Sequence, residues 1–383
     1  MIIEAKDPQI MAEVIAAAAA DGRRLGLQGG GSKIGLGQPM TVDDQLDLSG
    51  WRGITSYEPE ELVLSARAGT PLADIEVALA AQQQHLAFEP RNLSGLLEGG
   101  RVQDQTLGGV VATNLAGPRR CTAGAVRDHV LGLSAINGRG EIFKAGGRVV
   151  KNVTGYDLCK LLTGSFGTLA ALTEITLKVL PASETEETLV IAAPDVSKAV
   201  QQMAEALGGS AAPSAASWLD GKIFLRLEGF GPSVRARRQK LTDRFGAAEV
   251  LEDAASRDCW QAIRDVKPFH GRPGQAVWKL SIRPSDAPAL LGRLSELEEA
   301  RTFLDWGGAL VWLSLPAERD AKAGTIRQML PLGGQGWLVA APLAVRAAVP
   351  VFPPLLPALA ALQTRVKASF DPGFILNPGR MGF

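Results

Sequence analysis

Short apolar runs alternate with helical segments and many glycines along the first 181 residues of the chain. These runs predict strands at residues 25–28, 46–48, 62–68, 130–136 and 175–180. Residues 72–83 follow a helical period, and Thr70 and Pro71 ahead of them predict an N-cap and a first helical position. The alternation predicts an α+β domain over residues 1–181.

The N-terminus combines an apolar stretch with helix-starting residues. A short strand and then an amphipathic helix are predicted there, with Asp7 as the N-cap and Pro8 at the first helical position. Acidic residues within the stretch and the absence of a basic leading region argue against an export signal, so a cytoplasmic protein is expected. Further along, Asn137-Gly138 between two strand-like runs predicts a hairpin turn.

After Pro181 the glycine loops disappear and the helices carry more charge. Residues 187–250 predict the order strand, helix, strand, strand, helix, and residues 275–339 predict the same order again without matching sequence. Such a repeat is typical of a cap domain with one antiparallel sheet backed by helices. We therefore expect a cap over residues 182–354, followed by a C-terminal helix and a turn-rich tail over residues 355–383.

Composition narrows the function classes. The chain has 383 residues, of which 46% are hydrophobic and 21% charged, as in ordinary globular proteins. Forty basic residues balance 40 acidic ones without a basic stripe, so the charge pattern gives no support for a nucleic-acid partner. No apolar stretch reaches the ~20 residues of a membrane span. Three scattered cysteines and three histidines lack metal-ligand spacing, so no metal site is expected.

Three glycine-rich loops carry the candidate chemistry. The first, LQGGGSKIGLG at residues 27–37, follows a predicted strand. Glycines there permit backbone conformations that would let successive amides face an anion, with Ser32 and Lys33 nearby. Its spacing fits neither the Walker nor the Rossmann pattern. Taken alone, the loop predicts either an anion-binding site or a plain flexible turn.

The second loop, residues 105–117, contains Thr106, Gly108 and Gly109, and continues to CTAGAVRD at residues 121–128. A buried helix packed through its glycines is the alternative there. The third, residues 151–181, contains Gly164 and Gly167 ahead of a strand. Taken together, the three loops favour a site for an extended, anionic, dinucleotide-like ligand.

At this point the motifs form a recognisable set. The order GGGSK, TLGGVVATNLAG, KNVTGYDLCKLLTGSFGTL, ITLKVLP and FDPGFILNPGRM resembles the FAD-binding PCMH, or vanillyl-alcohol-oxidase-type, family. Within that family the chain is most similar to the FAD-binding subunits of bacterial glycolate oxidases. The resemblance covers residues 1–181 and the tail, and it is fainter across the cap. It implies a PCMH-type fold of two subdomains, followed by the α+β cap.

The resemblance also implies FAD contacts. The first loop would wrap the pyrophosphate, the second would follow the pyrophosphate, ribityl chain and flavin edge, the third would hold the adenine end, and the tail would approach the isoalloxazine. The residues carried over are Gly29, Gly30, Gly31, Ser32, Lys33, Thr106, Leu107, Gly108, Gly109, Asn114, Ala123, Gly124, Gly167, Ile175 and Asn377. Relatives that tether FAD covalently use a histidine near the first loop or a cysteine near the second. Residues 27–37 hold no histidine, and Cys121 lies outside an obvious tethering context, so non-covalent FAD is expected.

The catalytic residues are less clear. Arg264, Lys279 and Arg380 could pair with a substrate carboxylate, with ordinary surface ion pairs as the alternative. His270 is the cap's single histidine and a weak candidate base. The His-rich HxxxxGDGNxH-like segment of related 2-hydroxyacid dehydrogenases has no match here, which puts independent catalysis in doubt.

The resemblance implies an oxidoreductase subunit that oxidises glycolate or a related 2-hydroxy acid. Its electrons would pass to a second flavin subunit and an iron–sulfur subunit, because this chain lacks the cysteines for a cluster. Cytoplasmic location, or peripheral attachment to the inner membrane through those partners, is expected. Two alternatives stay open: a structural or electron-relay FAD subunit without a substrate site, and an FAD- and NADPH-dependent nucleotide-sugar enolpyruvate reductase.

Overall fold

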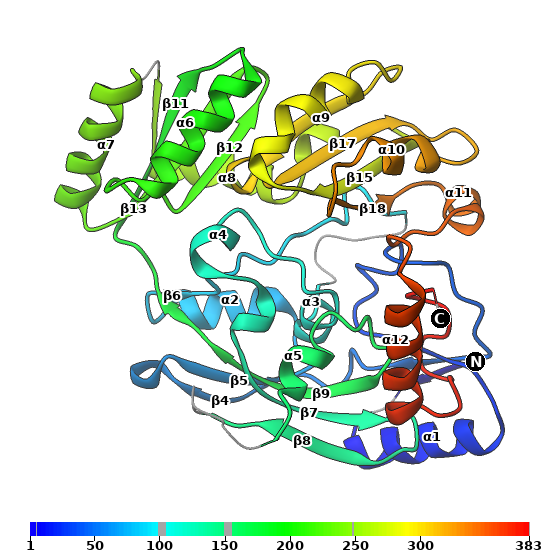
Figure 1. Ribbon diagram of the computed structural model, residues 1–383. Helices are drawn as coiled ribbons and strands as arrows, with labels where there is room; N and C mark the ends of the chain where they lie inside the picture. The colour runs from blue at the N-terminus through cyan, green and yellow to red at the C-terminus, as the bar shows by residue number, and fades with distance from the viewer. Residues whose placement is uncertain (5, 99–104, 149–154, 247–248, 383) are drawn as a thin grey trace. The chain divides into compact units, whose positions relative to one another are not determined.

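A computed structural model describes residues 1–4, 6–98, 105–148, 155–246 and 249–382 (Figure 1). The start of the third predicted loop, residues 151–154, lies outside the described residues. Backbone contacts divide the chain into two compact units. Unit 1 contains residues 1–115, 125–182 and 350–383, and unit 2 contains residues 116–124 and 183–349.

A five-stranded antiparallel sheet forms the centre of unit 1, in the order β4-β5-β9-β7-β8. Its strands are β4 (Ile54–Glu58), β5 (Val63–Arg67), β9 (Ala170–Lys178), β7 (Val130–Asn137) and β8 (Ile142–Gly146). Three short helices lie along one face of this sheet (Figure 1): α2 (Leu72–Ala80), α3 (Leu107–Thr113) and α5 (Leu158–Leu162). The short strands β6 (Gln84–His85) and β10 (Leu180–Pro181) pair with each other. Two short helical turns, η1 (Pro59–Glu61) and η3 (Val126–Asp128), precede β5 and β7.

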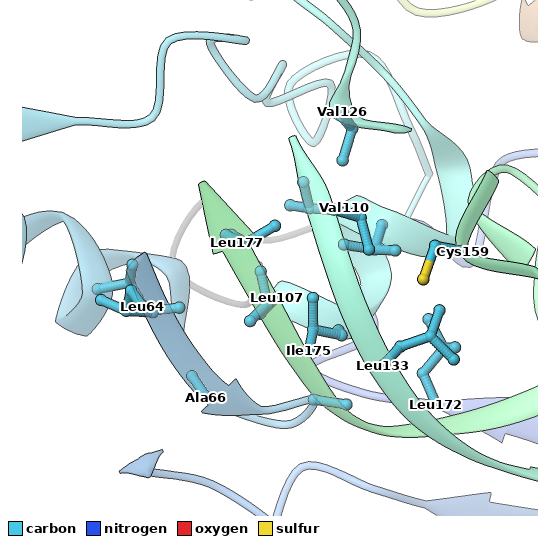
Figure 2. Packing of buried hydrophobic residues seen from close by; sticks show 14 of the residues in the cluster. Leu64, Ala66, Leu107, Val110, Val126, Leu133, Cys159, Leu172, Ile175 and Leu177 are labelled. Carbon is cyan, nitrogen blue, oxygen red and sulfur yellow. The ribbon is translucent and has the colours of Figure 1, made fainter. Parts of the chain in front are cut away.

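Packing between α3 and the sheet fixes the second predicted loop in place. Leu107 and Val110 project from α3 into the main core of unit 1 and are almost fully buried there. They meet Leu133 of β7 and Ile175 of β9 in the same cluster (Figure 2). Burying a leucine or isoleucine side chain stabilises the fold by about 1.5–3 kcal/mol. The N-terminal end of α3 is therefore held rigidly by its own apolar face.

A second, smaller sheet of parallel strands has the order β1-β3-β2. It comprises β1 (Ile2–Glu4), β3 (Asp44–Asp47) and β2 (Leu25–Gln28), with helix α1 (Pro8–Ala20) beside it. The Asp7 side chain accepts a hydrogen bond from the backbone N–H of Gln9, and Pro8 opens the helix, so both predictions at this terminus are confirmed. Strand β2 runs directly into the first glycine loop.

One predicted cap is wrong. Helix α2 begins one residue later than the sequence suggests, with Pro71 at the N-cap position and no side-chain cap bond. The Thr70 hydroxyl instead donates to the carbonyl of Arg67 at 2.7 Å and accepts from the N–H of Gly53 at 2.9 Å. A neighbouring turn competes for this hydroxyl, and tertiary contact outweighs the local capping preference.

Unit 2 is built on a single eight-stranded antiparallel sheet with the order β14-β11-β13-β12-β16-β17-β15-β18. Its first half comprises β11 (Thr185–Ala192), α6 (Val196–Gly208), β12 (Ala215–Leu219), β13 (Lys222–Gly229), α7 (Gly231–Phe245) and β14 (Glu249–Glu252). Its second half comprises β15 (Gln275–Ser281), α9 (Ala287–Leu294), β16 (Arg301–Asp305), β17 (Leu310–Pro316), α10 (Ala323–Met329) and β18 (Gln335–Ala340). Helices α6 and α9 pack against each other on the sheet (Figure 1).

The predicted topological repeat and the single antiparallel sheet are both confirmed, and each repeat has one more strand than predicted. The two halves follow β-α-β-β-α-β order, the split βαβ arrangement. They join edge to edge through β12 and β16, where Trp218 pairs with Leu304. Further elements of unit 2 are α4 (Arg120–Ala123), α8 (Asp253–Arg264), η4 (Lys267–Phe269), η5 (Pro284–Asp286), η6 (Trp306–Gly308) and α11 (Leu343–Ala348).

The chain then returns to unit 1 through helix α12 (Pro357–Phe370), drawn in red near the C-terminus in Figure 1. The tail after this helix pairs Leu376 with Leu25 of β2 in a parallel bridge. Across the described ranges, no helix has both the length and the apolar character that crossing a membrane requires.

Candidate functional site

The first glycine loop needs its glycines for close approach to the second loop. A Cβ built on Gly29 would lie only 2.4 Å from Oγ1 of Thr106, a separation that real side chains do not adopt. Gly31 has φ of +80°, a conformation that favours glycine. The loop that follows β2 is therefore a narrow backbone surface pressed against the start of α3.

Lys33 supplies a positive charge within this loop. Its side chain is half-buried, and its Nζ makes a long hydrogen bond of 3.5 Å to Oγ of buried Ser32. Desolvation lowers the pKa of the Lys33 ammonium to about 7. Among the residues that the structure describes, no carboxylate offsets this loss of hydration, so the site favours an anionic ligand.

The second loop meets the first through the start of α3. Thr106 is the N-cap, and its Oγ1 accepts from the N–H of Gly109 at 3.4 Å. A Cβ on Gly109 would come 3.8 Å from Cδ of Lys33, and one on Gly108 would clash with Ala68 at 2.9 Å. Gly108 is thus required for close approach to Ala68, whereas a Cβ at Gly109 would make only ordinary contacts.

Asn114 ends α3 in the left-handed conformation, which asparagine adopts more readily than most residues. Its Oδ1 accepts from the N–H of Arg127 at 3.2 Å. A Cβ on Gly164, which has φ of +89°, would lie 3.2 Å from the Asn114 Cβ. The second and third loops are therefore in direct contact at the C-terminal end of α3.

The third loop and the C-terminal tail meet at Gly167 and Asn377. A Cβ on Gly167 would lie 2.7 Å from Nδ2 of Asn377. The Asn377 amide bridges two chain segments: Oδ1 accepts from the N–H of Leu27, and Nδ2 donates to the carbonyl of Phe166, both at 2.7 Å. Three loops distant in sequence, together with the tail, are thus brought to one place in unit 1.

Sequence reasoning missed a fourth segment of this region. Glu89 and Arg91 are 8% and 1% exposed, which is rare for charged residues outside a functional or structural network. Gln105, at the start of the second loop, donates to the Arg91 carbonyl at 2.8 Å, and the Arg91 N–H bonds to Leu115 at the loop's far side. The available signal was two charges inside the otherwise apolar stretch LAFEPRNLSGLL.

Three other predicted FAD residues lie in the central sheet of unit 1 or at the end of α4 in unit 2. Ile175 sits inside the five-stranded sheet, paired with Ala66 and Leu133, and its side chain is in the hydrophobic core (Figure 2). Ala123 and Gly124 belong to unit 2 by their contacts, at the end of α4. Their roles at the cofactor stay predictions.

The candidate catalytic residues of unit 2 are spread over different elements. Arg264 ends α8 and is paired with the carboxylate of Asp265 at 2.8 Å, and His270 Nε2 lies 2.9 Å from the Asp265 carbonyl oxygen. Lys279, in β15, lies 5.3 Å from the ring of Trp306 and 4.8 Å from that of Trp337. An ammonium between two indoles is held by cation–π attraction. Their catalytic roles stay predictions.

Arg380, the fourth candidate, lies in unit 1 at the first glycine loop. Its Nη2 donates to the carbonyl oxygen of Lys33 at 2.8 Å, and its side chain is almost buried. The contact places its guanidinium beside the loop's backbone. Its pairing with a substrate carboxylate, like the other catalytic roles, stays a prediction.

Unit 2 also contains a buried charge cluster that sequence reasoning missed. Glu228 pairs with Arg119 through both carboxylate oxygens and with Arg226 at 3.3 Å. Burial works to raise the pKa of Glu228, but the two guanidinium groups outweigh it and hold that pKa far below its usual range. Arg226 also lies 4.8 Å from the Trp260 ring. This cluster fixes the segment containing Arg119 within unit 2.

Comparison with known proteins assigns the class. A model for the FAD binding domain family matches residues 1–146. Alkyldihydroxyacetonephosphate synthase shares the fold at a TM-score of 0.69 and 13% sequence identity, covering 98% of this chain and 75% of that one. The chain belongs to the FAD-binding, PCMH-type flavoprotein family.

Particular relatives extend the similarity over the whole chain. The glycolate oxidase subunit GlcE of Escherichia coli strain K12 is 37% identical over 388 residues, which cover 100% of this chain and 99% of the relative. A D-lactate dehydrogenase of Anaerostipes hadrus is 30% identical over 74% of this chain and 57% of its own length. The glycolate oxidase subunit GlcD of Bacillus subtilis strain 168 is 28% identical over 52% of this chain and 41% of its own length.

FAD fits the residues that the structure brings together. A flavin dinucleotide needs charge compensation for its diphosphate and close backbone approach along its length. Lys33 supplies an ammonium that no described carboxylate compensates, and Gly29 and Gly108 leave room for close backbone approach. FAD is the cofactor of this chain, and nothing indicates covalent attachment.

Proposed function

We propose that this chain is the FAD-binding subunit of a multi-subunit oxidoreductase that oxidises glycolate or a closely related 2-hydroxy acid. The observation that carries the proposal is the full-length similarity to a glycolate oxidase subunit. It spans both units and the tail, whereas the FAD binding domain model ends at residue 146. Shorter matches to another glycolate oxidase subunit and to a D-lactate dehydrogenase support the same substrate class.

Residues of unit 1 bind and orient the cofactor in this proposal. Lys33 would neutralise the diphosphate, and amides of the loop at residues 29–33 would donate hydrogen bonds to its oxygens. Each charge-assisted hydrogen bond of this kind contributes about 1.5–3 kcal/mol. When bound, FAD supplies hydride acceptance from the substrate's α-carbon. Arg264, Lys279, His270 and Arg380 are proposed only as weak catalytic candidates.

Electron transfer out of the chain requires partners in this scheme. The full sequence has three cysteines, fewer than an iron–sulfur cluster held by four thiolates needs. We therefore propose a second flavin subunit and an iron–sulfur subunit as acceptors, with the assembly in the cytoplasm or peripheral at the inner membrane.

A second candidate function is an electron relay or scaffold without its own substrate site. The supporting observation is that His270 is the sole histidine in residues 183–349 of the sequence. Its Nε2 already lies at hydrogen-bond distance from a backbone carbonyl. A histidine used in this way is less suited to take a proton from a substrate.

One anaerobic experiment separates the candidates. The purified chain is loaded with FAD, its visible spectrum is recorded, and glycolate, D-lactate or NADPH is added in parallel. Bleaching by glycolate in the isolated chain is the result expected for direct oxidation. Bleaching only after addition of the co-expressed companion subunits favours the relay. Bleaching by NADPH would refute both and favour the reductase.

A further inference from the structure

The segment from Asp371 to Met381, here called the C-terminal tail, starts at a buried ion pair. Lys367 in α12 and Asp371 are 1% and 0% exposed. The Lys367 ammonium donates to the Asp371 carboxylate, to the carbonyl of Thr168 and, at 2.9 Å, to the carbonyl of Leu376. An ammonium has three donors, so each has a partner inside the protein. This cation therefore joins helix α12, the third loop and the tail.

The Asp371 carboxylate also binds backbone N–H groups at the start of the tail, and together with Lys367 it anchors the tail. Its two carboxylate oxygens accept from the N–H groups of Ile375 at 3.2 Å and Leu376 at 2.8 Å. A Cβ on Gly138 would lie 2.3 Å from Asp371 Oδ1, so the hairpin between β7 and β8 leaves space for this carboxylate. Removing one partner of such a buried pair leaves the other uncompensated, which is strongly unfavourable.

From this anchor the tail runs beside β2, the strand that leads into the first glycine loop. The N–H of Leu25 donates to Ile375, and the N–H of Asn377 donates to Leu25, at 2.8 and 2.9 Å. The Asn377 side chain then ties Leu27 to Phe166, as described above. Leu25 in β2 and Leu27 at the start of the first loop are thus fixed relative to the third loop by tail atoms.

Arg380 holds the other end of the first loop. It donates to the Lys33 carbonyl at 2.8 Å, and its own carbonyl accepts from the N–H of Gln38 at 3.0 Å. Gly37, with φ of +75°, passes so close that its Cβ would lie 3.0 Å from the Arg380 oxygen. Tail atoms therefore contact the loop before, within and after its glycines.

We propose that the C-terminal tail positions the first glycine loop for FAD, with Asn377 and Arg380 as positioning residues, so that tail docking and FAD binding are thermodynamically coupled. The proposal rests on the assignment of residues 27–37 to the FAD diphosphate. A loop rich in glycine loses much conformational freedom on ordering. Bonds from the tail supply part of that order beforehand, which lowers the cost that cofactor binding must offset.

The first test measures FAD affinity by quenching of flavin fluorescence on the full chain. Arg380→Met removes the bond to Lys33, and Asn377→Ala removes the two side-chain bonds beside the loop. Each lost bond lowers affinity by a factor of about 2–10, so we expect roughly tenfold weaker binding for either variant. The matched control is Arg365→Met on the exposed side of α12, which should bind FAD as the wild type does.

A second measurement separates positioning from general destabilisation. Hydrogen exchange of the Leu376 and Asn377 amides is followed with and without FAD. Coupling between two binding events is reciprocal. Bound FAD should therefore slow the exchange of these amides by about the same factor by which loss of tail docking lowers FAD affinity. In Arg380→Met, the melting temperature of the FAD-free chain should stay near the wild-type value. The rise in melting temperature on addition of FAD should be smaller than in the wild type.

The outcomes are distinct. If the wild-type chain takes up no FAD at all, the proposed function fails and this inference with it. The tail is an ordinary structural element if both variants bind FAD as tightly as the wild type does. The same conclusion follows if FAD does not change the hydrogen-exchange rates of the tail amides. Weaker FAD binding with unchanged stability of the FAD-free chain, in Arg380→Met, supports positioning even if Asn377→Ala does not fold.

Discussion

Lys33 makes FAD binding depend on pH, because its ammonium has no close carboxylate in the first glycine loop. Its pKa is lowered from 10.5 to about 7 by desolvation in the FAD-free chain. A bound diphosphate would raise that pKa again by direct attraction. Between the two pKa values, binding of FAD must therefore take up a proton.

The direction in which FAD affinity changes with pH follows from this proton uptake. Below pH 7 Lys33 is already charged, so FAD affinity is constant there as far as this group is concerned. As pH rises through the pKa of the FAD-free chain, affinity falls by up to tenfold per pH unit. A group of pKa about 7 is about 90% charged at pH 6 and about 1% charged at pH 9. Over that interval we expect a loss of about a hundredfold, or about 2.7 kcal/mol.

The stability of the FAD-free chain has the opposite dependence. The folded chain holds the Lys33 proton less tightly than the unfolded chain, so the cost of burying this charge is fully present below pH 7. It is relieved as pH rises from 7 towards 10.5. Weaker FAD binding at pH 9 is therefore not a sign of unfolding caused by this residue.

The assay is titration of the FAD-free chain with FAD at steps from pH 6 to pH 9, at constant ionic strength. Lys33→Arg is the matched control, because arginine stays charged throughout and should remove most of the slope while keeping affinity. Lys33→Met should be flat and about ten- to a hundredfold weaker at pH 6. A wild-type titration without slope, or an equal slope in Lys33→Met, would refute the reasoning.

Two further perturbations test the site and the cap separately. Gly29→Ala places a methyl group against Thr106 Oγ1 at 2.4 Å and should weaken FAD binding at least tenfold in a fluorescence titration. Gly292→Ala, in an open position of α9, should keep FAD affinity and add roughly 0.5–1 kcal/mol of stability. Glu228→Gln leaves buried Arg226 and partly buried Arg119 without their full counter-charge and should cost about 3–5 kcal/mol in chemical denaturation. The exposed Glu205→Gln should cost less than about 1 kcal/mol, and equal losses would contradict this account.

Local patterns predicted the elements whose partners are close in sequence. Asp7 and Pro8 begin α1 as expected, because the cap bond needs only neighbouring backbone atoms. The repeat in unit 2 was visible from alternation alone, since each half is a self-contained βαββαβ order. Thr70 departs from the pattern because a hydroxyl can serve either a helix start or a turn, and Gly53 is distant in sequence.

The FAD contacts were carried over from the family resemblance and stay predictions, whereas the glycine positions themselves predict where backbone segments approach closely. Gly29, Gly108 and Gly167 each abut a residue from another segment, and a glycine motif reports that need without reporting the partner. Lys367 and Asp371 gave no comparable signal, since a lysine four residues before an aspartate is ordinary on a helix surface. Their burial emerges only when the tail folds over them.

The sequence by itself predicted the glycine loops, an extended anionic ligand for them and most of the order of strands and helices, because these depend on short-range sterics and periodicity. The identity of that ligand as FAD came from the family resemblance. Tertiary structure alone decided that Asn377 joins Leu27 to Phe166, and that Arg380 lies at the first loop. It also decided that residues 116–124 pack with unit 2. Such contacts depend on packing between distant segments, whose geometry no local pattern encodes.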